Sequence, residues 1–162
     1  MERIEQYWQQ FLHETDRSAD TKYLESFYFG SNEQSANNLL QLVLSGKKKA
    51  TCSSLAYFEA IGEEVPKPGD FSIITDWAGT PFCVIQTKQV ALMAFKDMTF
   101  DICKREGEDE HLESWQSNHI YFFTEEGKQY GYEFSWDMEV VFEDFEVVYT
   151  EESMYDIDNA RL

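Results

Sequence analysis

The segment Pro66-Lys67-Pro68-Gly69-Asp70 constrains the fold of this chain more than any other stretch of its sequence. Two prolines followed directly by a glycine cannot continue a helix or a central strand, so the backbone must turn here. Beyond this break, residues 71–75 are predicted as a strand, residues 76–79 as a turn, and residues 81–90 as the returning strand. The sequence therefore predicts a β-hairpin directly after the break.

The chain before the break is predicted to be mainly helical. Apolar and aromatic residues recur at helical spacing over roughly the first fourteen residues, which predicts an amphipathic helix. An aromatic connector follows over residues 23–30, and Ser31 or Asn32 can cap a second helix that ends at Gly46. The segment 52–60 is apolar and aromatic, and its pattern does not decide between helix and strand.

The chain after the hairpin alternates between helical and strand patterns. A short helix is predicted over residues 97–104, an acidic loop over residues 105–110, and a longer helix from His111 onward. Gly127 and Gly131 mark the end of that helix or the loop beyond it. Residues 138–150 alternate as a long strand, with a bulge or turn at residues 143–144.

Together these elements predict a single α+β domain. Its strands are expected to be mostly antiparallel and curled into a small β-barrel, with helices ahead of the barrel and inserted between its strands. A chain of 162 residues is long enough for one domain with a substantial core and short for two. We predict a helical N-terminal extension over residues 1–26, the main domain over residues 27–150 and an acidic tail over residues 151–162.

The charge of the chain limits its possible partners. There are 13 basic residues against 31 acidic ones, which gives a net charge of −18. Such a field repels phosphate backbones and opposes the salt-driven binding of long nucleic acids. A basic cleft can still act locally, so any nucleic-acid partner is predicted to be short and single-stranded, or a lone nucleoside.

Cysteine usage and hydropathy indicate the cellular compartment. Cys52, Cys83 and Cys103 are odd in number and widely spaced, and with the three histidines they form no metal signature. We therefore predict no metal, no cofactor and no disulfide framework, as is typical of a reducing cytosol. No apolar stretch approaches a membrane span, and the N-terminus lacks the apolar core of a signal peptide. The sequence predicts a soluble cytoplasmic protein without a membrane partner and leaves its oligomeric state open.

The segment from Leu44 to Cys52 holds the only concentrated positive charge in the chain. Gly46 ends the preceding helical pattern, and three consecutive lysines follow it where a helix dipole favours cations. This spacing alone is well explained by a solvated helix end. It also places the hydroxyl of Thr51 three residues after Lys48, and a hydroxyl becomes a nucleophile when a base accepts its proton. A lysine serves as that base only where burial or neighbouring cations favour its neutral form.

Several motifs now occur in a characteristic order. They are Gly46-x-Lys48-x-x-Thr51, Pro66-x-Pro68-Gly69-Asp70, the strand Cys83-Val84-Ile85-Gln86-Thr87, Glu106-Gly107-Glu108, Leu112-x-x-Trp115, His119-x-x-Phe122-Phe123 and Phe145-Glu146-Val147-Val148-Tyr149. This ordered set resembles the ASCH domain family, whose fold is a β-barrel similar to the PUA domains that bind RNA. The resemblance covers roughly residues 27–150, so the main domain is predicted to be an ASCH, PUA-like domain.

The resemblance implies binding of RNA or a modified nucleoside in a cleft beside the lysine motif. Some small bacterial members of the family are amidohydrolases that remove the acetyl group of N4-acetylcytidine, and others have been assigned single-strand ribonuclease activity. The positions that match the amidohydrolase pattern are Lys48, Thr51 and Glu108. The implied chemistry is acyl transfer, with Lys48 as base, Thr51 as nucleophile and Glu108 as acid or substrate-orienting group. A ribonuclease and a non-catalytic RNA-binding module are the alternatives.

The predicted substrate-binding residues surround these positions. They are Gly46, Ser53, Trp77, Glu106, Trp115 and His119. Trp77 lies at the predicted hairpin tip, where an exposed ring suits base stacking. Trp115 and His119 lie on an apolar helical face, where packing into the core is the more common role.

Two positions depart from the family pattern. Ser53 stands where many relatives have arginine, and the loop reads Glu106-Gly107-Glu108-Asp109-Glu110 where relatives often have Glu-Gly-Glu-Gly-Asp. The missing arginine removes one contact to a phosphate or base. The altered loop leaves open whether Glu106 or Glu108 faces the cleft.

Overall fold

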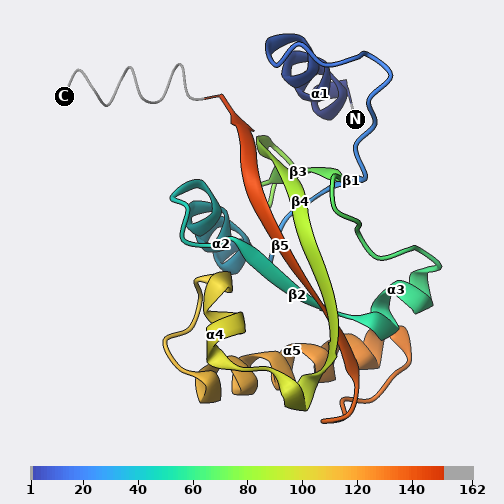
Figure 1. The fold of residues 1–162 in the computed structure, drawn as a ribbon, viewed down its shortest axis with the longest axis vertical. Coiled ribbons are helices and arrows are strands. Elements are labelled where there is room, and N and C mark those ends of the chain that lie inside the picture. The colour runs from blue at the N-terminus through green and yellow to red at the C-terminus, as the bar shows by residue number, and fades with distance from the viewer. Residues whose placement is uncertain (1, 152–162) are drawn as a thin grey trace.

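The computed structural model describes residues 2–151 and shows a curled five-stranded sheet with helices around it (Figure 1). The strands are β1 (Glu25–Phe27), β2 (Ala50–Ser54), β3 (Phe71–Thr75), β4 (Pro81–Ala94) and β5 (Glu139–Thr150). The α-helices are α1 (Glu2–Glu14), α2 (Glu33–Leu44), α3 (Leu55–Ile61), α4 (Phe100–Cys103) and α5 (Leu112–Tyr130). Two 3-10 helices are η1 (Phe95–Asp97) and η2 (Lys104–Glu106). The predicted acidic tail lies outside the described residues, apart from residue 151.

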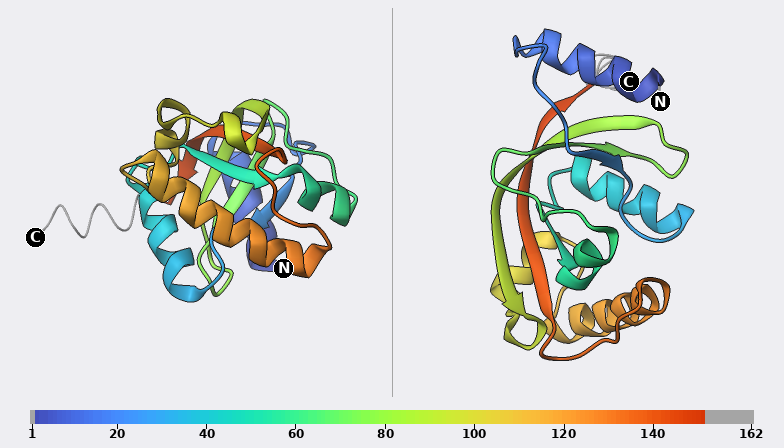
Figure 2. Two further views of the ribbon diagram at one scale, coloured as in Figure 1. Left: turned by 90° about the horizontal axis from the view of Figure 1, so that it is seen from below. Right: turned by 90° about the vertical axis from the view of Figure 1, so that its right-hand side faces the viewer.

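The sheet has the strand order β1-β3-β4-β5-β2. β1 pairs with β3 in parallel, and the other neighbouring strands are antiparallel. The long strands β4 and β5 bow along one side of the molecule, and α2, α3 and α5 lie on the other side of them (Figure 2). The sheet forms a curled half-barrel, so the predicted α+β fold with a mostly antiparallel, barrel-like sheet is confirmed.

Two elements show where the sequence pattern was too short to interpret. The segment predicted as an aromatic connector contains the strand β1. The sequence does not indicate this strand, because three residues are too few to show the alternation of a strand. The ambiguous segment 52–60 holds both element types, since β2 ends at Ser54 and α3 begins at the next residue. The Ser54 hydroxyl oxygen accepts a 3.1 Å hydrogen bond from the Tyr57 N–H and so caps α3.

The last helix is longer than its glycines indicated, and the last strands are irregular at other positions than expected. α5 continues through Gly127 and ends at Tyr130, and Gly131 follows it with a φ of +85°, the left-handed conformation typical of a helix end. The predicted irregularity near residues 143–144 exists, but the extra residue is Lys88 on β4. There Thr87 pairs with Phe145, and the next pair joins residues 89 and 144.

Three groups of buried side chains hold the helices on the sheet. One lies between β2, β5 and α5 and includes Cys52, Phe95, Trp115, Phe123 and Phe142. The second packs α1 on β3 and β4 through Trp8, Phe11, Phe71, Ile73 and Val84. The third packs α2 on the sheet through Leu40, Val43, Ile74, Ile85 and Phe145. Helix α1 thus shares a core with the sheet, and the predicted division into extension, domain and tail stays a prediction.

Candidate functional site

The lysine segment leaves α2 through a sharp turn and then runs between η2 and β5. Gly46 has a φ of +82°, which glycine adopts without steric cost, and it redirects the backbone. The Lys49 N–H donates to the Arg105 carbonyl at 2.9 Å, and the Lys49 carbonyl accepts from the Phe145 N–H at 2.9 Å. These two backbone hydrogen bonds fix the segment on both sides. Lys49 is exposed as a result, whereas Lys48 points inward and is only 2% exposed.

The ammonium group of Lys48 lies among acceptors from distant parts of the chain. Its Nζ donates to the Ala50 carbonyl at 2.8 Å and to Glu108 Oε2 at 2.6 Å. Glu106 Oε1 lies 3.7 Å away, and the Phe29 ring centroid lies 5.0 Å from the same nitrogen. A buried charge of this kind is tolerated because it is both paired and hydrogen-bonded.

Gly107 brings both carboxylates to Lys48. A Cβ atom at this position would come within 2.2 Å of the Lys47 carbonyl oxygen, and the residue has a φ of +72°. Only glycine meets both demands, because a side chain would clash with the backbone and strain its own conformation. The loop therefore lies directly against the lysine segment, with Glu106 and Glu108 on either side of the point of contact.

Glu106 is the buried member of the pair and is 2% exposed. Its Oε2 accepts a hydrogen bond from Trp115 Nε1 and lies 3.5 Å from His119 Nε2, while its Oε1 faces Lys48. Burial alone would raise the pKa of Glu106, but His119, Lys48 and Trp115 together hold it below its ordinary value. The Glu108 side chain is 26% exposed, so Glu108 is the carboxylate that reaches solvent.

His119 supplies the second positive charge near Glu106. Its Nδ1 lies 2.9 Å from the Trp115 carbonyl oxygen, which only accepts, so Nδ1 carries a proton. Nε2 can then donate to Glu106 only in the imidazolium form. Burial lowers the pKa of His119, but the hydrogen bond and the charge of Glu106 outweigh it, and the pKa is raised. The imidazole also stacks on the Trp115 ring, with centroids 4.1 Å apart and planes at 22°.

Thr51 and Ser53 lie on a different face of the sheet from this cluster. Ala50 and Cys52 point into the core beside α5, so the alternate residues of β2 face the opposite way. The pairing register places Thr51 directly opposite Glu143 of β5. Within residues 2–151, neither hydroxyl makes a hydrogen bond to Lys48 or to the two carboxylates. The structure therefore groups Lys48, Glu106, Glu108, Trp115 and His119 in one cluster. Thr51 and Ser53 lie outside this cluster, on the other face of β2.

Trp77 is separate from the cluster as well. It lies in the turn between β3 and β4, is 40% exposed, and its ring centroid lies 4.8 Å from that of Tyr28. The backbone N–H of Trp77 donates to Asn37 Oδ1 at 3.3 Å. The predicted exposed tryptophan is thus present, but its partner is a second aromatic ring.

A family model described as the ASCH domain matches residues 25–149. The chain belongs to the ASCH domain family. This ASCH domain is similar to an ASCH domain structure from Lactobacillus crispatus, with 34% identity, 92% of this chain and 96% of that chain covered, and a TM-score of 0.81. It is also similar to a protein structure from Enterococcus faecalis, with 35% identity, coverage of 91% and 88%, and a TM-score of 0.84. No protein of curated function matches the chain. The ASCH domain family is thought to bind RNA.

Several residues that shape the site in this ASCH domain are not indicated by the sequence. Arg105 Nε lies 2.8 Å from Asp144 Oδ1, and its guanidinium carbon lies 5.2 Å from the Phe142 ring centroid. The Arg105 side chain thus links η2 to β5. In the sequence Arg105 is only a basic residue at the start of an acidic loop, which does not indicate this ion pair. Phe29 and the carbonyl of Ala50 carry no sequence signal for a contact with Lys48.

Two hollows of this ASCH domain lie away from this cluster. A cavity of about 460 Å³ lies near α1 and β1, and another of about 960 Å³ lies at the C-terminal end of α5. Neither is lined by Lys48, Glu106 or Glu108. Across the described part of the chain, no three His, Cys, Asp or Glu side chains are grouped so as to hold a metal ion. In the same residues, no helix combines the length and apolar character needed to cross a membrane.

Proposed function

We propose that this ASCH domain binds a nucleoside or a short single-stranded RNA beside Glu108, and that it hydrolyses the acyl group of N4-acylated cytidine-like nucleosides. The observation that supports this best is the 2.6 Å hydrogen bond from buried Lys48 Nζ to Glu108 Oε2. Glu108 is thereby oriented from the interior while 26% of its side chain stays exposed. A carboxylate accepts hydrogen bonds from the exocyclic nitrogen of cytosine, so an oriented Glu108 suits that group.

The charge of the chain favours a small ligand over a long one. The net charge of −18 repels each phosphate that lies beyond the immediate site. The positive charge of Lys48 is shared between two carboxylates and does not reach solvent, so it offers little attraction to a phosphate backbone. A nucleoside carries no phosphate and meets none of this repulsion.

The proposed reaction uses the three residues that match the amidohydrolase pattern. The substrate separates Lys48 from Glu108, and the proton that the two groups share moves to Glu108. Thr51 Oγ1 then attacks the acyl carbonyl carbon while the neutral amine of Lys48 accepts the hydroxyl proton. The bond between the acyl carbon and N4 then breaks, and N4 receives a proton from Glu108. Water hydrolyses the threonine ester, which releases the carboxylic acid and restores the hydroxyl.

Binding without hydrolysis is the second candidate, and the burial of Lys48 favours it. The Lys48 side chain is 1% exposed, and Thr51 lies on the strand face opposite Ala50. In this arrangement Lys48 serves to orient Glu108, and Glu108 alone recognises the ligand. The two candidates share a binding group and differ in whether Thr51 reacts.

The test is the release of cytidine from N4-acetylcytidine, followed by chromatography. We expect Lys48→Ala and Thr51→Ala to lower the rate by at least about 100-fold, which is the usual effect of removing a base or a nucleophile. Lys49→Ala is the matched control, because Lys49 is exposed, and it should keep the wild-type rate. Full hydrolysis by Thr51→Ala would show that Thr51 is not the nucleophile.

A binding measurement separates the two candidates if no hydrolysis occurs. Cytidine that binds to the wild type and not to Glu108→Gln supports the non-catalytic candidate. Binding to a short single-stranded RNA, measured at two salt concentrations, then reports the number of phosphate contacts. A steep loss of affinity with salt would favour RNA over the nucleoside.

A further inference from the structure

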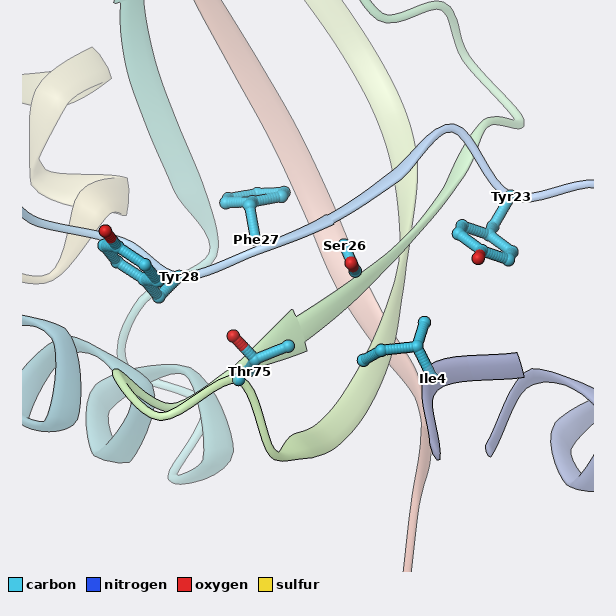
Figure 3. A pocket seen from close by; sticks show the side chains of 7 residues that line it. Ile4, Tyr23, Ser26, Phe27, Tyr28 and Thr75 are labelled. Carbon is cyan, nitrogen blue, oxygen red and sulfur yellow. The ribbon is translucent and has the colours of Figure 1, made fainter. Parts of the chain in front are cut away.

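A cavity of about 460 Å³ lies between α1, β1 and the turn that joins β3 to β4 (Figure 3). It is lined by Ile4, Tyr23, Ser26, Phe27, Tyr28, Thr75 and Gly79. Its volume falls in the range of about 300–1,000 Å³ that is typical of small-molecule sites. The lining contains no carboxylate and no ammonium group, so it favours a neutral ligand.

Two hydroxyl groups share one side of this cavity. Ser26 of β1 pairs with Ile73 of β3 in parallel register, and Thr75 follows two residues later on the same face. Ile73 packs under α1, so this face is the one that α1 covers. Figure 3 shows the Ser26 and Thr75 side chains beside Ile4 of α1. Thr75 is 4% exposed, whereas Ser26 is exposed.

The hydrogen bonds of these hydroxyls determine what a ligand must offer. Thr75 Oγ1 donates its proton to the Asp76 carbonyl at 2.8 Å, so the oxygen is left to accept. Among residues 2–151, the Ser26 hydroxyl has no side-chain hydrogen bond and remains able to donate. A matching ligand therefore presents an N–H to Thr75 and a nearby acceptor to Ser26.

The walls of the cavity are aromatic. Tyr23 closes one side, and Tyr28 lies at the other with 40% of its surface exposed. The Tyr28 ring packs on Trp77, which is not part of the cavity lining, with the two planes at 52°. Tyrosine rings in a cavity wall favour a flat ring through stacking.

We propose that this cavity binds a neutral planar ring with a lactam edge, in which an N–H lies next to a C=O. The ring lies against Tyr28, its N–H donates to Thr75 Oγ1, and its C=O accepts from the Ser26 hydroxyl. The ligand is either a free heterocycle or the base of a nucleoside. This site is independent of Lys48 and of the function proposed for it.

The test is an NMR titration of the ¹⁵N-labelled full chain with uracil, uridine and 1,3-dimethyluracil. We expect uracil or uridine to shift the amide signals of Ser26, Thr75 and Gly79. The dimethylated ring keeps the planar ring and both carbonyl groups but carries a methyl group in place of each N–H hydrogen, so it should bind at least about tenfold more weakly. Binding of uracil identifies a free heterocycle as the ligand class, and binding of uridine alone identifies a nucleoside.

Variants of the chain complete the test. Thr75→Val keeps the side-chain shape and should weaken binding by about tenfold, and Ser26→Ala, at an exposed position, should weaken it by a smaller factor. Tyr121→Ala is the control, because Tyr121 is 71% exposed on α5, and it should leave the affinity unchanged. The proposal is overturned if no signal shifts, if dimethyluracil binds as well as uracil, or if neither hydroxyl variant matters. Loss of the shifts in Lys48→Met with its fold intact would also overturn it, because the ligand would then occupy the Lys48 site.

Discussion

Glu106 is a buried carboxyl group and Glu143 a half-buried one, and both lie near β2 in opposite electrostatic surroundings. Glu106 lies beside Lys48 and His119 and accepts from Trp115, and these partners outweigh burial and lower its pKa. Burial raises the pKa of Glu143, and the 2.6 Å hydrogen bond from the Thr87 hydroxyl only partly offsets it. Burial acts in the same direction on both groups, so the difference comes from their neighbours.

The two faces of β2 differ in the charges that surround their carboxyl groups. On one face Lys48 and His119 balance Glu106 and Glu108, which gives a cluster of two positive and two negative groups when the histidine is protonated. On the other face Thr51 lies opposite Glu143, whose charged neighbours are acidic. The residues that match the amidohydrolase pattern thus belong to two environments that meet at one strand. Charge substitutions should therefore have opposite effects on the two faces.

The largest expected effect is that of Lys48→Met. This change leaves Glu106 and Glu108 without their shared cation and should lower the free energy of unfolding by about 3–5 kcal/mol. Chemical denaturation monitored by tryptophan fluorescence measures it. Lys49→Met alters an exposed neighbour and should change stability by less than about 0.5 kcal/mol. Equal effects of the two variants would contradict the charge-balanced cluster.

The fold was predictable where the signals are local. The turn at residues 66–70, the glycine that follows α2 and the alternation in β5 each depend on residues close in sequence, and each predicted the correct element. β1 was missed because its identity depends on pairing with β3, more than forty residues away. Local patterns do not report such pairings.

The candidate site was predictable in its residues and not in its arrangement. Lys48 and Glu108 were singled out, but their hydrogen bond spans 60 positions in the sequence. The acidic loop predicted over residues 105–110 did not indicate that Glu106 is buried, and the structure shows it to be 2% exposed. The sequence gives no sign of this, because the burial depends on Gly107 meeting the backbone of Lys47. Side chains alternate between the two faces of β2, so Thr51 points away from the face on which Lys48 lies. This alternation can be assigned only when the position of β2 is known.

Gly107→Ala should weaken the charge-balanced face without removing any charge. The left-handed conformation alone costs a non-glycine residue about 1–3 kcal/mol, and the contact with the Lys47 carbonyl adds to this cost. Gly62→Ala is the matched control, because Gly62 has a φ of +70° and open space around its Cβ position. The excess destabilisation of Gly107→Ala over Gly62→Ala measures the contact. No excess would mean that the loop can move away freely.

The pH dependence of stability tests the pair formed by Glu106 and His119. The pKa of Glu106 is lowered on folding, so its contribution is present above the ordinary carboxyl pKa of 4.5 and is lost as pH falls further. The pKa of His119 is raised, so its contribution is complete below 6.5 and is lost as pH rises through the folded value. The stability difference between wild type and His119→Gln should therefore be largest near pH 5–6 and should decrease toward pH 9. A difference independent of pH would show that the imidazole acts through packing alone.

The smallest expected effect has the opposite sign and concerns Glu143→Gln. Because the pKa of Glu143 is raised on folding, its ionised form destabilises the native state, and the penalty grows as pH rises above the ordinary value of 4.5. An amide oxygen still accepts from Thr87, so Glu143→Gln should raise the free energy of unfolding at pH 7 by about 0.5–2 kcal/mol. The gain should disappear near pH 4, where Glu143 is protonated in both states. Glu106→Gln should instead destabilise at pH 7, and if both variants destabilised there, neighbouring charge would not distinguish the two faces of β2.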